Sequence, residues 1–163
     1  MEYITYYDSP LGEIILLAKE SALTGLLFNE QKFAPDLKSY TEKELPIHSQ
    51  TKKWLDVYFS GKNPDFCPGI EYSGTDFQLE VWNELRKIKY GEVVTYRDVA
   101  RVVAKSRGVP KMSAQAVGQA VGRNKIAIIV PCHRVIGTNG NLVGYSGGLD
   151  RKIKLLELES KFQ

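Results

Sequence analysis

The chain has 163 residues, of which 43% are hydrophobic and 25% charged, a composition that is typical of a soluble globular protein and excludes fibrous and disordered classes. No apolar run approaches the length that spans a bilayer, and the first residues lack the basic-then-apolar pattern of a signal peptide, so we expect a cytoplasmic protein without membrane contact. The formal net charge of +3 hides an asymmetry, because residues 1–74 carry 7 basic and 11 acidic side chains whereas residues 75–163 carry 15 and 8.

The first third of the chain shows the alternation and turn residues of strands. Turn formers at 9–12 and 19–21 separate the apolar segments, so we predict an antiparallel meander with strands at residues 4–7, 13–17 and 23–28. A helix is then expected from Ser49 to Gly61, and residues 63–73 are expected to form a linker. The apolar face of that helix comprises Trp54, Leu55, Tyr58 and Phe59.

Three helices are predicted to follow the linker. Thr75 and Gln78 form a capping box ahead of the first. Thr95 and Ser113 can cap two shorter helices joined by a turn at 108–110, which indicates a helix-turn-helix. The second of these short helices has small side chains at Ala114, Ala116, Gly118, Ala120 and Gly122. Such a bare surface suits close approach to another helix as well as to nucleic acid.

The segment from Arg97 to Lys125 is strongly basic, with seven Lys or Arg and the single acidic residue Asp98. A field of this kind attracts a phosphate backbone. A solvated basic face explains the charge equally well.

Cys132 and His133 are the first candidates for chemistry. The two cysteines and two histidines have no spacing for a disulfide framework or a structural zinc site. A strand is predicted at 127–130, ending at Pro131, so the thiol would lie where a strand stops. A reactive thiol needs a nearby base or positive charge, and His133 could act through a bridging water. The alternative is a buried thiol beside an imidazole with a purely structural role.

Glu159 is expected to point inward from a C-terminal helix. Leu149, Ile153 and Leu156 define the apolar face of this helix, and the helical period places Glu159 beside it. A buried carboxylate needs a partner, which gives a relay of Glu159, His133 and Cys132. An ordinary salt bridge with Lys152 or Arg134 is an equally good explanation.

Two motifs carry a family resemblance. Residues 131–136 (Pro-Cys-His-Arg-Val-Ile) and 144–148 (Gly-Tyr-Ser-Gly-Gly) resemble the signature of the O6-alkylguanine-DNA alkyltransferases, or methylated-DNA–protein-cysteine methyltransferases. The similarity covers residues 75–159, while residues 1–72 resemble the family's N-terminal domain only in length and order of elements. The resemblance implies an α+β fold, with a ribonuclease-H-like antiparallel sheet plus helix at 1–72 and a winged-helix-like domain with a helix-turn-helix at 73–163.

The same resemblance implies DNA repair by a single-turnover transfer. A methyl or larger alkyl group would move from O6 of guanine, or O4 of thymine, to Cys132 after the base flips out of double-stranded DNA. His133 would be the water-mediated base, held by Glu159, while Asn124 braces the turn and Tyr96 donates to the leaving guanine. No cofactor and no metal are implied, and we expect a monomer.

The resemblance also assigns a base pocket and a DNA-contacting helix. The pocket residues are Val135, Tyr145 and Ser146. The DNA contacts are Ser113, Ala114, Gln115, Ala116, Gly118 and Arg123. Gln115 stands where many members carry an arginine that fills the space of the flipped base, so duplex binding should be weakened.

Two other functions remain as alternatives. Alkyltransferase-like proteins share the helix-turn-helix and the lesion pocket but lack the acceptor cysteine, and the presence of Cys132 argues against that class. A winged-helix transcription regulator would read bases with large polar side chains, whereas this helix offers mainly alanine and glycine.

Overall fold

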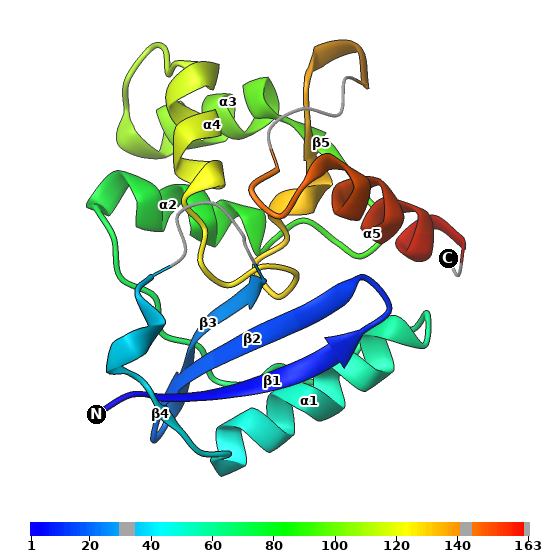
Figure 1. Cartoon of the computed structure of the whole chain (residues 1–163). Coiled ribbons are helices and arrows are strands. Elements are labelled where there is room, and N and C mark those ends of the chain that lie inside the picture. Colours follow the sequence, from blue (N-terminus) through cyan, green and yellow to red (C-terminus); the bar gives the residue numbers. More distant parts are fainter. Residues whose placement is uncertain (30–34, 141–144, 162–163) are drawn as a thin grey trace.

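The N-terminal part of the chain is an antiparallel sheet with a helix on one face (Figure 1). The computed structural model describes residues 1–29, 35–140 and 145–161. The predicted meander is confirmed and consists of β1 (Tyr3–Ser9), β2 (Gly12–Lys19) and β3 (Ala22–Phe28). A short strand, β4 (Thr41–Glu42), pairs parallel to β1, so the sheet order is β3-β2-β1-β4.

Both faces of β2 are buried. Ile14 and Leu16 belong to the large core that the sheet shares with α1 (Pro46–Phe59) and the C-terminal part. Ile15 and Leu17 point the other way, into a smaller cluster against which Leu37 and Tyr40 pack. Alternating side chains of one strand therefore serve two layers.

Helix α1 begins at Pro46 and not at Ser49, so its predicted start is wrong. Proline is favoured in the first turn, where its missing N–H has no helical acceptor. His48 accepts the Leu45 amide through Nδ1 at 2.9 Å, and the Ser49 hydroxyl bonds Glu44 at 3.0 Å and does not cap. The helix ends before Gly61, as predicted, and that glycine has a φ of 92°.

The C-terminal part contains the predicted helices and their caps. Thr75 and Gln78 form the capping box of α2, and the side chains of Thr95 and Ser113 cap α3 and α4. Gly108, with φ 69°, ends α3 and allows the chain to turn into α4, so the helix-turn-helix is confirmed. The elements after the linker are α2 (Asp76–Leu85), β5 (Val94–Thr95), α3 (Tyr96–Arg107), α4 (Ala114–Gly122), β6 (Val135–Ile136) and α5 (Leu149–Lys161).

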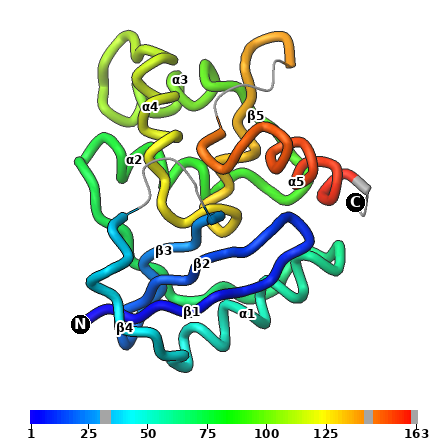
Figure 2. Tube along the Cα trace, in the orientation of Figure 1, coloured from blue at the N-terminus to red at the C-terminus, as the bar shows by residue number. Residues whose placement is uncertain are grey.

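Residues 127–130 form a tight turn, so the predicted strand there is wrong. Within this segment, Ile126 is the residue that pairs with the edge of β3, through bonds that join Leu26 to Lys125 and Ala127 at 2.8 and 2.9 Å. Figure 2 shows this segment passing beside β3. The chain then folds back with Ile128 at φ 68°, and a bond joins the Val130 amide to the Ile126 carbonyl at 3.1 Å. The run is apolar because the turn is buried in the core.

Helix α5 buries a different face from the one predicted. Leu149 is 48% exposed, whereas Lys152, Leu155 and Glu159 are the buried side chains, at 0–1% exposure. Glu159 is buried as expected, but Lys152 lies on the same inner stripe, and the pattern of apolar residues did not reveal it. In the described part of the chain, no helix is both long and apolar enough to cross a membrane.

Candidate active site

The Cys132 thiol is buried where the C-terminal part meets the core of the sheet. It is 3% exposed and opens a 3-10 turn, η2 (Cys132–Arg134), in which the Arg134 amide donates to the Pro131 carbonyl at 3.0 Å. The other cysteine, Cys67, is exposed on the linker. Its sulfur accepts from Arg86 Nη2 at 3.8 Å, so it lies beside a positive charge at the surface, whereas Cys132 is enclosed by the protein.

Asn124 holds the turn that leads into Cys132. Its Nδ2 donates to the carbonyls of Val130 at 2.9 Å and Ile126 at 3.3 Å, and its Oδ1 accepts the Ile126 amide at 3.0 Å. One buried side chain thus ties together both ends of the 126–130 turn. This is the placement that the bracing role of Asn124 requires.

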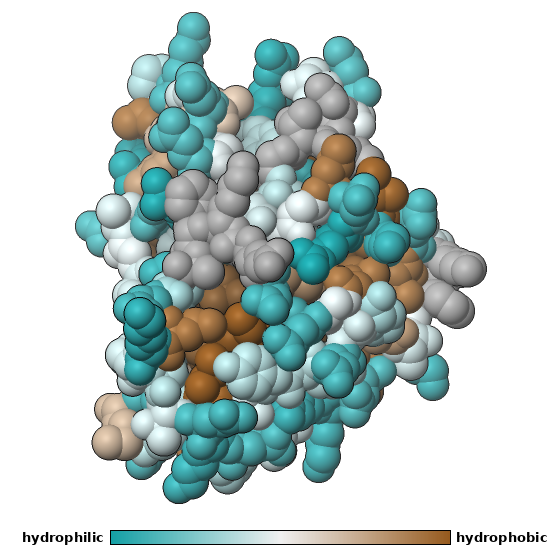
Figure 3. Space-filling view, viewed as in Figure 1, coloured by the Kyte–Doolittle hydropathy of each residue, from teal (hydrophilic) through white to brown (hydrophobic). Residues whose placement is uncertain are grey.

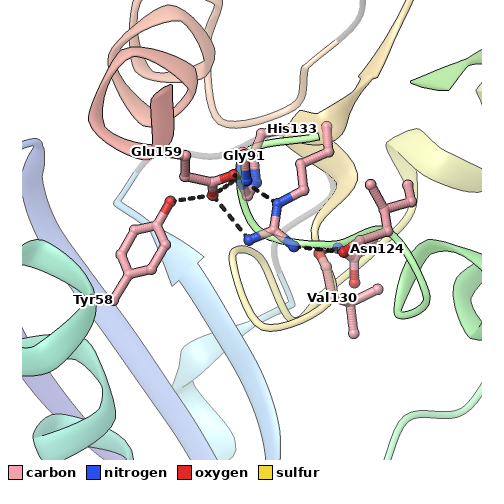
Figure 4. A network of polar contacts seen from close by, with 8 residues as sticks. Tyr58, Gly91, Asn124, Val130, His133 and Glu159 are labelled. Carbon is pink, nitrogen blue, oxygen red and sulfur yellow. Dashed lines mark hydrogen bonds and ion pairs between the residues drawn. The ribbon is translucent and has the colours of Figure 1, made fainter. Parts of the chain in front are cut away.

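Glu159 is the centre of a buried polar cluster, shown in Figure 4. Its Oε2 is 2.5 Å from His133 Nε2, 2.7 Å from the donating hydroxyl of Tyr58 and 3.0 Å from Arg134 Nη2. Its Oε1 accepts from Arg134 Nε at 2.7 Å and from the Gly91 amide at 3.3 Å. The relay contact and the salt bridge, which the sequence left as alternatives, are therefore present together.

The charges of this Glu159 cluster determine its protonation. Burial alone would raise the pKa of Glu159, but its bonds to His133 and Arg134 outweigh burial and hold the pKa well below the usual range. Burial lowers the pKa of His133. The positive charges of Arg134 and Lys152 lower it further, whereas the bond to Glu159 raises it. At neutral pH, Glu159 is ionised and His133 is uncharged.

The resting sulfur is a protonated thiol. Burial raises the pKa of Cys132 to about 11, although Asn124 and Lys152 oppose the rise. A neutral imidazole can act as a general base. The Cys132 thiol would therefore lose its proton during attack on the alkyl group and not before it. His133 Nδ1 is buried and has no hydrogen-bond partner among the described residues.

Lys152 was missed by the sequence analysis as a site residue. It is fully buried, donates from Nζ to the Val135 carbonyl at 2.6 Å and lies 5.8 Å from the centre of the Tyr96 ring. Burial lowers its pKa to about 8, and nearby Cys132 works against that change. The available signal was its position about two helical turns before Glu159 on the same stripe of α5. Tyr58, also missed, offered none because it is 101 positions from Glu159.

A cavity of about 710 Å³ lies beside this site. It is bounded by the start of α2, by α4 and by the segment at Tyr145 and Ser146, and its lining includes Ala116, Gly118 and Arg123. Tyr145 connects the cavity to the thiol, because burial and the nearby Cys132 raise the pKa of its hydroxyl. Gly144 of the predicted motif lies outside the described residues.

The close approach of Tyr145 requires a glycine in the same segment. A Cβ on Gly147 would lie 2.7 Å from the Tyr145 ring and 3.0 Å from the Phe28 ring. Tyr96, at the start of α3, packs near Gly118, and burial raises its pKa to about 12. Val135 is buried, and its carbonyl already accepts from Lys152.

The predicted DNA-contacting residues lie on the surface of α4. Ser113 caps the helix by accepting the Ala116 amide at 3.2 Å, and Ala114 and Gln115 are exposed in its first turn. Arg123 follows the helix and is exposed. Figure 3 shows hydrophilic side chains over the end of the molecule formed by α3 and α4. Within the described residues, no group of three or more His, Cys, Asp or Glu side chains could hold a metal ion.

Comparisons with known proteins agree on one family. Residues 76–161 match "6-O-methylguanine DNA methyltransferase, DNA binding domain", and residues 3–67 match its "ribonuclease-like domain". A methylated-DNA–protein-cysteine methyltransferase of Mycobacterium leprae is 45% identical, over 93% of this chain and 88% of the relative. A methyltransferase of the same name from Haemophilus influenzae is 38% identical, over 96% of this chain and 86% of the relative. The crystal structure of the Mycobacterium tuberculosis O6-methylguanine methyltransferase has a TM-score of 0.87 at 42% identity, covering 100% of this chain and 95% of that one. Another structure shows the M. tuberculosis OGT in complex with DNA. It has a TM-score of 0.86 at 42% identity and covers 98% of this chain and 93% of that one.

Proposed function

Because this chain belongs to the family of 6-O-methylguanine DNA methyltransferases, we propose that it repairs DNA by moving an alkyl group from O6 of guanine, or O4 of thymine, to Cys132. The observation that carries the assignment to Cys132 is its burial beside the His133–Glu159 pair and next to a cavity lined by α4. The exposed Cys67 has no such surroundings.

The reaction needs one bond to form and one to break. The Cys132 sulfur attacks the alkyl carbon, the carbon–O6 bond breaks, and its electron pair stays with guanine. The thiol proton passes to His133, through a water at Nδ1, while Glu159 holds Nε2 and stabilises the imidazolium. Tyr96 gives the departing guanine a proton or a hydrogen bond. Asn124 and Glu159 act as positioning residues.

The product explains a single turnover. Attack leaves a thioether on Cys132, and a thioether is a stable bond that gives the alkyl group no evident route to leave. Each molecule would therefore repair one lesion, without a cofactor.

The lesion has to leave the duplex to reach the sulfur. O6 lies on the paired edge of a stacked base, and flipping costs a few kcal/mol, less for a damaged pair. We place α4 against DNA, with Ser113, Ala114 and Gln115 at the duplex, and the flipped base in the cavity with Tyr145 and Ser146. The Val135 carbonyl would bind the base on its remaining lone pair.

The chain is proposed to act as a monomer with two domains, at residues 1–72 and 73–163. The two family matches, which end at 67 and begin at 76, support a boundary in this interval.

Intact mass spectrometry after incubation with a duplex containing O6-methylguanine tests the proposal. We expect a gain of about 14 Da, one methylene, because the thiol proton is replaced by a methyl group. Peptide mapping should place the gain on Cys132, and Cys67→Ser should still gain it. A mass that does not change, or a label on Cys67, would remove the proposal. Cys132→Ala should bind the lesion duplex without gaining mass.

A further inference from the structure

One member of the Glu159 cluster comes from the N-terminal part of the chain. Tyr58 lies on α1, is fully buried and donates to Glu159 Oε2 at 2.7 Å. Figure 4 shows its ring reaching from α1 toward Glu159 on α5. The His133–Glu159 pair is therefore completed by a residue that lies outside the C-terminal part.

Aromatic neighbours fix the direction of the Tyr58 hydroxyl. Trp54 stacks on the ring with the planes 6° apart and the centroids 5.4 Å apart. Phe59 and Tyr90 pack edge-on, at 5.3 and 6.1 Å. With the ring held on three sides, the hydroxyl has one placement, and Glu159 is the acceptor there.

Tyr58 bonds the same carboxylate oxygen that faces His133. Oε2 is 2.5 Å from His133 Nε2, so the two bonds share the negative charge of one atom. A hydroxyl that donates to a carboxylate disperses its charge and fixes its orientation. The bond to Tyr58 thus limits how strongly Glu159 holds a proton on His133.

We propose that Tyr58 is a positioning residue for alkyl transfer, which orients Glu159 and keeps His133 uncharged and ready to accept the thiol proton. The inference rests on the proposed function, because the His133–Glu159 pair matters to chemistry only if Cys132 accepts the alkyl group. It gives the N-terminal part a role in the reactivity of Cys132.

Other groups also face the His133–Glu159 pair. Arg134, in the 3-10 turn η2, forms an ion pair with Glu159, while Lys152 lies on α5 and Tyr90 follows α2. The other titratable groups near the pair are Cys132 and Tyr145. Replacing Tyr58 by phenylalanine leaves all of them in place and keeps the stacked ring, so a change in the titration of His133 would come from the lost hydroxyl.

The test is the pH dependence of the reaction with free O6-benzylguanine, which requires no DNA binding. In Tyr58→Phe, Oε2 regains negative charge and holds the imidazolium more tightly, so less His133 is neutral at a given pH. We expect the acidic limb of the rate profile to move to higher pH by up to about one unit, so that the rate at a fixed pH on that limb falls by up to about tenfold. Tyr7→Phe is the matched control, because the Tyr7 hydroxyl also donates to a carboxylate at α1, Asp56, at 2.7 Å. Its profile should coincide with that of the wild type.

Two further variants make the outcome decisive. In a Glu159→Gln background, Tyr58→Phe should no longer move the acidic limb, because its effect passes through the carboxylate. Difluorotyrosine at position 58, a stronger donor of the same shape, should move the limb to lower pH, and it tests the idea even if Tyr58→Phe does not fold.

A lower rate with an unmoved acidic limb, or a difluorotyrosine variant whose limb moves to higher pH, would show Tyr58 to be structural only. Absence of transfer by the wild type would remove the proposed function and this inference together, whereas normal transfer with unmoved limbs would remove only the inference.

Discussion

Lys152 is the charged side chain that the fold brings to Cys132. Its positive charge lowers the pKa of the thiol, which burial raises to about 11. We expect Lys152→Met to raise the thiol pKa further and to slow reaction with O6-benzylguanine about tenfold at neutral pH, since one unit of pKa corresponds to a tenfold change in thiolate. Thiolate absorbance against pH, in a Cys67→Ser background, measures the shift.

Lys154→Met is the control for this prediction, because Lys154 is exposed on the same helix. Lys152→Met removes a charge that burial disfavours, but it also removes the donor to the buried Val135 carbonyl, so its unfolding midpoint should be measured to show that the fold is retained. A thiol titration identical to that of the wild type would show that Lys152 does not act on Cys132.

Helix α4 is the element expected to meet DNA, and Gln115 lies exposed in its first turn. Gln115→Arg adds a positive charge there, so duplex affinity should rise and the slope of log affinity against log salt should steepen by up to about one unit. Gln50→Arg adds the same charge on the exposed side of α1, at the opposite end of the molecule in Figure 1, and should leave both quantities near wild type. Equal effects of the two variants would mean that α4 has been placed wrongly.

A second substitution at Gln115 separates base flipping from chemistry. Gln115→Ala removes the side chain proposed to fill the space of the flipped base, so repair of duplex DNA should slow while reaction with free O6-benzylguanine stays at the wild-type rate. Quench-flow rates with the two substrates make the comparison. Equal slowing of both, or of neither, would exclude this role.

The whole molecule should lose stability in acid, because buried histidines in both parts stay uncharged in the fold. Burial lowers the pKa of His133 and of His48. The unfolded chain therefore binds more protons below about pH 6.5, and each histidine lowers the free energy of unfolding by up to about 1.4 kcal/mol per pH unit. Glu159, whose pKa is lowered in the fold, adds a further loss as the pH falls below about 4.5, the range where its unfolded carboxyl takes up a proton. Urea midpoints at pH 8, 6 and 4 measure this.

Two variants assign the acid sensitivity to these groups. His48→Gln should flatten the change between pH 7 and 5, and Glu159→Gln should flatten the change below pH 5. Midpoints that do not depend on pH in the wild type would contradict the burial of neutral histidines.

Local signals in the sequence predicted much of the fold. The capping residues Thr75, Thr95 and Ser113 each act on an amide three positions away, so their helices could be located from the sequence alone. The three strands followed from alternation and turns. The predicted strand at 127–130 failed because an apolar run specifies burial and not backbone conformation, and here the side chain of Asn124 ties the run into a turn.

The sequence by itself determined which groups could do chemistry, and the tertiary structure decided what surrounds them. Cys132 and His133 are adjacent in the chain, and the helical period turned Glu159 inward, so these three could be named in advance. The contact of Tyr58 depends on packing between segments far apart in the chain, for which local periodicity carries no signal. The helical period put Lys152 on the stripe of Glu159, but only the fold shows that it meets the Val135 carbonyl. Only the folded molecule shows that one carboxylate binds His133, Arg134 and Tyr58 at once, because a buried carboxylate needs hydrogen-bond partners and these come from three separate segments of the chain.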